Sequence, residues 1–183
     1  MQHTKIPFKN TKIFSPFFLD YIERKETLKK FYHRAPSIQS FEAQIQEKQK
    51  SFSIDSRTIL SETLREQYKE LKISNLVDNN IKSLKDATTF TITTGHQLNI
   101  FTGPLYFIYK IVSVINACKQ LKRTYPKYNF VPVYWMASED HDFEEISYFK
   151  LYGKKHTWET DQKGGVGRFD PKGLKNIIAD LPG

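Results

Sequence analysis

The sequence predicts an α/β protein with a helical N-terminal segment, then the start of a parallel sheet built as strand–helix–strand, then a β-hairpin. Three observations support this. Apolar residues recur every three to four positions from Pro16 to Ser83, which is typical of amphipathic helices. The pattern then changes to the β-branched alternation of a strand at Thr88–Thr94. A long helical pattern and a second strand follow, and a helix between two neighbouring strands makes them parallel.

The helical N-terminal region is predicted to span residues 1–87. Its apolar stripes are short and lie on segments rich in Glu, Lys and Gln, so each stripe needs another surface to cover it. The stripes are Phe17 to Ile22, Ile38 to Ile45, Leu60 to Leu71, and Leu76 to Leu84.

Residues 88–183 are predicted to form the first part of a core that binds a nucleotide or another substrate. After the strand Thr88–Thr94, Gly103-Pro104 marks the start of a helix that runs from Leu105 to about Lys122, because proline is favoured at the first helical position. Phe130–Met136 is the second strand, and Pro132 within it indicates an early or edge position.

The remaining chain adds little to the predicted sheet. Ile146–Tyr152 and His156–Thr160 are expected to pair as a hairpin, and a short helix is expected at Leu174–Ala179. A doubly wound sheet needs more strands than these, so an incomplete domain is expected.

Composition narrows the function classes. The 14% aromatic content indicates a folded chain. The net charge of +8 is spread along the sequence, which makes nucleic-acid binding unlikely and suits anionic small molecules. The single cysteine, Cys118, fits a reducing compartment. The chain shows neither a signal-peptide pattern nor a run of ~18 apolar residues. We therefore expect a cytoplasmic protein without a membrane segment.

Two segments are predicted to face each other across one crevice, because ligands of open α/β sheets bind beyond the carboxyl ends of the strands. The first follows the first strand, and its candidate binding residues are Thr94, Gly95, His96 and Gln97. Gly95 permits a tight turn there, and His96 is a candidate for proton transfer or for donation to a phosphate. Thr102 and Gly103 precede the next helix, whose free N–H groups suit a phosphate or carboxylate.

The second segment packs three carboxylates and one histidine into four residues. Its candidate residues are Ser138, Glu139, Asp140, His141 and Asp142. Ser138 is a candidate cap for a helix that begins near Phe143, and acidic residues complement a first helical turn. Alternatively, Asp140 or Asp142 orients His141, or these groups hold an amine, a hydroxyl or Mg²⁺. No set of metal ligands is evident, so none is assigned.

A glycine-rich segment, Gly164-Gly165-Val166-Gly167-Arg168, is a third candidate. It could cradle an anion, with Arg168 as a clamp. It lacks the strand-to-helix context of a phosphate-binding loop, which favours a flexible connection instead.

Three motifs carry a family resemblance. One runs from Thr94-Gly95-His96-Gln97 through Phe101-Thr102-Gly103-Pro104-Leu105-Tyr106 to Ile108-Tyr109-Lys110. The second is the unbroken stretch 131–145, and the third runs from Trp158-Glu159-Thr160 to Gly167-Arg168-Phe169. Together they resemble the N-terminal part of the cysteine ligases of bacillithiol biosynthesis, whose members are much longer than this chain.

The resemblance implies a Rossmann-like core related to class I aminoacyl-tRNA synthetases. It also implies an amide-forming ligase that joins the carboxyl group of cysteine to the amine of glucosaminyl-malate. Such a reaction needs activation, and by analogy ATP would form a cysteinyl-adenylate, with Mg²⁺ as a candidate cofactor. A homodimer is a candidate assembly for the full-length enzyme.

The match to the synthetase signature is partial. Class I synthetases carry His-x-Gly-His at this junction, whereas this chain has His96-Gln97 without a second histidine at the matching spacing. Binding and catalysis therefore both stay open for His96. In the predicted mechanism Asp140, His141 and Asp142 hold or deprotonate the amine, with His141 as the base. The alternatives are a metal-dependent phosphoesterase and a non-catalytic nucleotide- or RNA-binding module.

Overall fold

The computed structural model describes residues 4–101 and 103–181. The chain divides into two compact units, Met1–Ser51 and Phe52–Gly183. The helices of residues 54–83 fall in the second unit with the sheet, whereas the sequence pattern grouped them with the helical region 1–87. A domain boundary near residue 87 stays a prediction.

The first unit is built from short helices: α1 (Phe8–Thr11), α2 (Pro16–Ile22), η1 (Glu26–Phe31) and α3 (Ser40–Ser51). The Ser15 hydroxyl accepts a hydrogen bond from the Phe18 N–H at 3.2 Å and caps α2. The Phe14 and Phe18 rings stack at 4.6 Å, and Phe8 meets both edge-on. Aromatic contacts thus hold α1 and α2 together.

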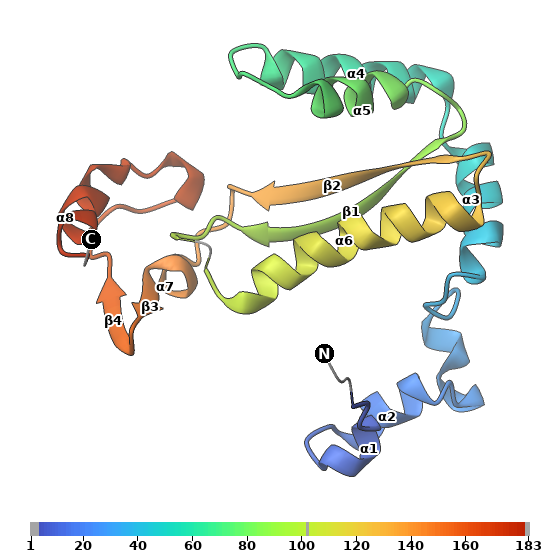
Figure 1. The fold of residues 1–183 in the computed structure, drawn as a ribbon, viewed down its shortest axis with the longest axis horizontal. Coiled ribbons are helices and arrows are strands. Elements are labelled where there is room, and N and C mark those ends of the chain that lie inside the picture. Colours follow the sequence, from blue (N-terminus) through green and yellow to red (C-terminus); the bar gives the residue numbers. More distant parts are fainter. Residues whose placement is uncertain (1–3, 102, 182–183) are drawn as a thin grey trace. The chain divides into compact units, whose positions relative to one another are not determined.

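The centre of the second unit is the predicted strand–helix–strand. Strand β1 (Thr89–Gln97) pairs in parallel with β2 (Asn129–Ala137), and α6 (Leu105–Thr124) connects them. Figure 1 shows the two strands side by side with α6 running along them. Leu121 of α6 and Phe130 and Val131 of β2 are buried. The α/β class and the parallel pair are therefore confirmed.

Two element boundaries differ from the prediction. Residues Gly95, His96 and Gln97 belong to β1 and form no turn, because β2 extends to Ala137 and the parallel ladder continues to its end. Pro104 is the N-cap of α6 with extended backbone angles (φ −69°, ψ 150°), one position before the first helical residue. Neither shift was visible in the local sequence, since both depend on pairing or backbone geometry.

Helix α6 exposes most of its apolar face. Six apolar residues recur along this helix at helical spacing; five of them are 37–66% exposed, and of the six only Leu121 is buried. The exposed residues are Leu105, Ile108, Tyr109, Val112 and Ile115. A two-stranded sheet is too narrow to cover so broad a face. No helix in residues 4–101 or 103–181 is long and apolar enough to cross a membrane.

A buried arginine joins α4 (Ile54–Tyr68) and α5 (Asn75–Ser83) to the start of the sheet. Arg57 is 3% exposed, and its Nη1 donates to the carbonyls of Asp86 at 2.9 Å and Thr89 at 2.7 Å. Its guanidinium lies 5.1 Å from the Phe52 ring centre and 5.7 Å from that of Phe90. Desolvation lowers the pKa of Arg57. Arg57 thereby holds the 84–89 turn that leads into β1.

The C-terminal part contains the predicted hairpin. After α7 (Phe143–Ile146), strands β3 (Tyr148–Leu151) and β4 (Lys154–Thr157) pair antiparallel. The two turn residues, Tyr152 and Gly153, have φ values of 48° and 79°, as a type I′ turn requires. The predicted hairpin is confirmed, and its second strand begins two residues earlier than predicted. Short helices η2 (Val166–Arg168), η3 (Pro171–Gly173) and α8 (Leu174–Ala179) complete the unit.

Candidate functional site

A network of polar side chains lies at the carboxyl end of β1. Glu145 of α7 is its centre: one carboxylate oxygen accepts from Gln97 Nε2 at 2.6 Å, and the other accepts from the Tyr106 hydroxyl at 2.9 Å. Tyr106 also contacts His96 Nε2 at 2.7 Å. Gln97 of the first predicted segment therefore meets Glu145, which lies three residues beyond the second segment; a crevice between the two segments themselves stays a prediction.

The hydrogen bonds of His96 fit one neutral tautomer. Nδ1 lies 3.1 Å both from Asn99 Nδ2, which can only donate, and from the Gln97 carbonyl oxygen, which can only accept, so these two contacts do not select a tautomer. The Glu145 carboxylate does, because Tyr106 must donate to it and therefore accepts from Nε2–H, which leaves Nδ1 as the accepting nitrogen. Burial, and secondarily Glu145, raises the pKa of Tyr106, which keeps its phenol a donor. The His96 side chain is 8% exposed, so it forms part of the floor of the site.

Two buried acceptor oxygens in this network have no protein partner among the described residues, Gln97 Oε1 and Asn99 Oδ1. The orientation of each amide is set by its nitrogen, because Gln97 Nε2 donates to Glu145 and Asn99 Nδ2 donates to the Gln97 carbonyl at 3.0 Å. Buried acceptors are normally satisfied. The site therefore calls for donor groups from water or from a ligand.

Two further side chains fasten the end of β1. Lys110 of α6 donates to the Gly95 carbonyl at 3.2 Å, and its ammonium lies 5.4 Å from the Tyr106 ring centre. The Tyr134 hydroxyl, whose pKa is raised by burial, donates to the His96 carbonyl at 3.0 Å. Gly95 allows this close packing, because an added Cβ would lie 3.0 Å from the Trp135 carbonyl oxygen. The interpretation of Gly95 as a turn residue was wrong, and its contact with a ligand stays a prediction.

The second predicted segment forms a turn between β2 and α7. Asp142, rather than Ser138, caps α7, since its carboxylate accepts from the Glu145 N–H at 3.3 Å. Asp140 accepts from the Asp142 N–H at 2.9 Å. No hydrogen bond within the described residues joins either carboxylate to the His141 ring, and their role in orienting it stays a prediction.

His141 is held instead by the main chain. Its Nδ1 lies 3.1 Å from the Glu139 carbonyl oxygen, which can only accept. Neutral His141 therefore carries its hydrogen on Nδ1 and leaves the Nε2 lone pair free. The side chain is exposed, as a residue that meets a substrate must be.

The glycine-rich segment packs on this turn. The N–H groups of Val166 and Gly167 donate to the carbonyls of Asp140 and Ser138 at 2.8 and 2.9 Å. A Cβ on Gly167 would lie 2.5 Å from that of Ser138, so only glycine permits the approach. The glycines thus serve close backbone packing, which the sequence did not distinguish from an anion cradle.

Arg168 and Gly103, two of the predicted residues that the structure describes, make no hydrogen bond to the network. Arg168 ends η2 with an exposed side chain that makes no ion pair within the described residues, so its role as a clamp stays a prediction. Gly103 has a φ of 53° and packs on Asn99. Thr102 lies outside the described residues.

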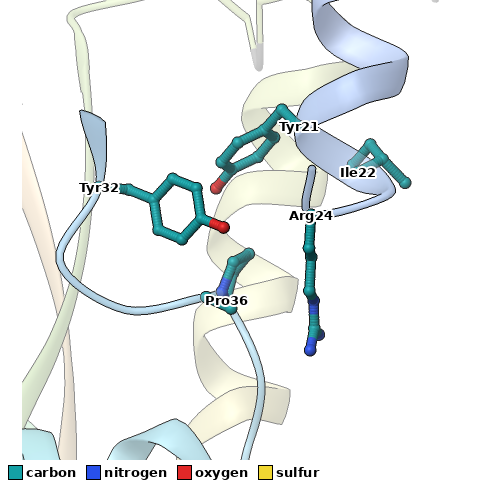
Figure 2. A pocket seen from close by; sticks show the side chains of 6 residues that line it. Tyr21, Ile22, Arg24, Tyr32 and Pro36 are labelled. Atoms are coloured by element: carbon teal, nitrogen blue, oxygen red, sulfur yellow. The ribbon is translucent and has the colours of Figure 1, made fainter. Parts of the chain in front are cut away.

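Two other places were considered as sites. Within residues 4–101 and 103–181, no cluster of three or more His, Cys, Asp or Glu side chains is arranged to hold a metal ion. A cleft of about 210 Å³ lies in the first unit, and the rings of Tyr21 and Tyr32, which line it, meet edge-on at 5.6 Å. Figure 2 shows the side chains that line this cleft. None of the predicted site residues lines that cleft.

Several residues of the network were not predicted as site residues, although all but one lie in the quoted motifs. They are Asn99, Tyr106, Lys110, Tyr134 and Glu145. From sequence alone, a tyrosine or lysine on the first turns of a helix is as compatible with an ordinary surface position as with a binding site. Only the pairing of β1 with β2 brings Glu145 to Tyr106, 39 positions earlier.

The fold and the site define a class: a Rossmann-like α/β domain with a polar site at the carboxyl end of its parallel strands. The whole chain, residues 1–183, matches the family model described as "Bacillithiol biosynthesis BshC, N-terminal Rossmann-like domain". The chain belongs to this family.

Named relatives agree with the family model. The protein of Flavobacterium psychrophilum called "Putative cysteine ligase BshC" is 55% identical over 174 residues, 94% of this chain and 33% of the relative. The proteins of the same name from Flavobacterium johnsoniae and Cytophaga hutchinsonii are 50% and 44% identical. The chain spans about a third of the length of these relatives.

Proposed function

We propose that this domain supplies part of the active site of a ligase of bacillithiol biosynthesis, which joins the carboxyl group of cysteine to the amine of glucosaminyl-malate. The observation that carries the proposal is the contact between two motifs of this family. Gln97 at the end of β1 and Glu145 of α7 meet at 2.6 Å and close one polar site.

The chemistry of the site suits an amine-bearing substrate. Its acceptors are the Glu145 carboxylate, which is 47% exposed, and the unpartnered oxygens Gln97 Oε1 and Asn99 Oδ1. An amine supplies the donors that such groups need, and a buried acceptor left unmatched is costly. Asp140 and Asp142 are engaged by main-chain N–H groups and contribute negative charge beside the site.

His141 is the proposed general base. An amine must lose its proton to form an amide, and a neutral imidazole nitrogen is a suitable acceptor near neutral pH. The Glu139 carbonyl holds the hydrogen on Nδ1, so Nε2 is the nitrogen that takes the proton.

Activation of the cysteine carboxyl by ATP is part of the proposal. The first turn of α6 has no side-chain cap from the described residues. The Phe107 N–H donates to the Pro104 carbonyl at 3.0 Å, so the N–H groups of Leu105 and Tyr106 are the proposed donors to a phosphate or carboxylate. Lys110, on the next turn, adds a positive charge. Asp140 and Asp142 are the residues that would hold Mg²⁺ with the nucleotide.

Calorimetric titration of the protein with glucosaminyl-malate and, separately, with ATP tests the proposal. We expect saturable binding of glucosaminyl-malate that is weakened by His141→Ala. His33→Ala, which removes an exposed histidine of the first unit, is the control and leaves binding unchanged. If neither ligand binds to a folded polypeptide of the relatives' full length, the proposed function is wrong.

A further inference from the structure

We propose that Glu145 is a positioning residue of this site, whose carboxylate fixes the tautomer and orientation of His96 through Tyr106. The inference deepens the proposed function and rests on it for the effect on turnover. The hydrogen-bond geometry carries it independently of the substrate.

The geometry starts from the carboxylate. One oxygen of Glu145 accepts from Tyr106 at 2.9 Å and also lies 3.5 Å from His96 Nε2. The other oxygen accepts from Gln97, the residue that follows His96 in β1. A single side chain of α7 therefore holds both the ring of His96 and the strand end that carries it.

The carboxylate decides the tautomer because it cannot donate. Tyr106 must direct its only hydrogen to Glu145, so its oxygen accepts from His96 Nε2–H. In the opposite tautomer, Tyr106 would donate to Nε2 and would face Glu145 across 2.9 Å with no hydrogen between the two oxygens. Nδ1–H would also point at the donor Asn99 Nδ2, although the Gln97 carbonyl at 3.1 Å could accept from it. With Glu145 absent, that second arrangement becomes accessible.

The neighbouring acid provides a matched control. Glu144 lies on the same short helix and is exposed, and its carboxylate makes no hydrogen bond or ion pair within the described part of the chain. Substitution of Glu144 removes the same charge from α7 without touching the network.

The first experiment is nitrogen-15 NMR of the protein with labelled histidine side chains, at a pH where His96 is neutral. The wild type is expected to carry the hydrogen on Nε2. Glu145→Ala is expected to populate the Nδ1–H form, whereas Glu144→Ala keeps the wild-type pattern. Backbone amide spectra establish that each variant is folded.

A second pair of variants tests separately the charge and the length of the side chain at position 145. Glu145→Gln keeps the length and offers Tyr106 an acceptor oxygen if Gln97 turns its unpartnered Oε1 toward the new NH2 group, and we expect it to retain Nε2–H. Glu145→Asp keeps the charge but is one carbon shorter, and we expect it to lose that form. This pair decides the question even if Glu145→Ala does not fold. Retention of Nε2–H in folded Glu145→Asp or Glu145→Ala overturns the proposal, whatever the activity.

Turnover is then measured in a polypeptide of the relatives' full length that carries this domain. Glu145→Asp is expected to lower kcat about 100-fold with little change in KM, since displacing a positioned group by about 1 Å has an effect of that size. Normal turnover despite a changed tautomer overturns the positioning role. Absence of amide formation in the wild type contradicts the proposed function instead, while the NMR result still decides whether Glu145 fixes His96.

Discussion

Replacing Arg57 with methionine should strongly destabilise the second unit. Methionine keeps an apolar stem of similar shape and removes all the donors. The two short bonds to the Asp86 and Thr89 carbonyls are lost, together with longer ones of 3.3 Å to Leu84 and 3.5 Å to Ala87. The turn that these carbonyls form leads directly into β1, so the loss affects the anchoring of the sheet.

The magnitude follows from those bonds. A hydrogen bond to a charged group contributes about 1.5–3 kcal/mol, and an acceptor left buried without a partner costs about 1–3 kcal/mol. The buried guanidinium has no carboxylate within ion-pair distance among the described residues, so burying its charge is itself costly. The substitution removes this desolvation cost, which offsets part of the loss in stability. We expect a net loss of about 3 kcal/mol in the free energy of unfolding.

Urea unfolding followed by tryptophan fluorescence measures this loss, since both tryptophans, Trp135 and Trp158, lie in the second unit. Arg65→Met is the control, because Arg65 is an exposed residue of the same helix without a partner in the described structure. A change for Arg57→Met as small as that for Arg65→Met, within about 0.5 kcal/mol of the wild type, would refute the reasoning.

Two further predictions concern packing and the buried thiol. Gly167→Ala should destabilise the second unit by about 1–3 kcal/mol, because its Cβ would meet Ser138 at 2.5 Å. Gly153→Asn, at an open position with positive φ that asparagine tolerates, should barely change the melting temperature. Equal effects of the two substitutions would contradict this. Burial raises the pKa of Cys118 from 9.0 to about 11, so a thiol reagent at pH 8 should modify it only after unfolding. The stability contributed by the un-ionised thiol is complete below about pH 9 and is lost as the pH rises to about 11, and Cys118→Ser should abolish this component.

Much of the fold could be predicted because the patterns are local. The alternation at Thr88–Thr94, the apolar repeat from Leu105 and the turn at Gly153 each reflect the geometry of one element. The extension of β1 to Gln97 could not be predicted, since it requires a partner strand that reaches Ala137. The assignment of the α7 cap to Ser138 failed for a similar reason: several polar residues in a row can each cap, and backbone geometry selects Asp142.

The candidate site, like the fold, could be predicted from the sequence only in part. The sequence indicated the edge of the sheet and the motifs that meet there, because the carboxyl ends of parallel strands share one edge. It could not show that Glu145 is the residue that joins them, that His96 faces inward, or that the glycines near residue 167 serve packing. Those facts depend on contacts between residues about 30 to 50 positions apart. Such contacts arise only when the parallel pairing of β1 and β2 sets their distance and direction.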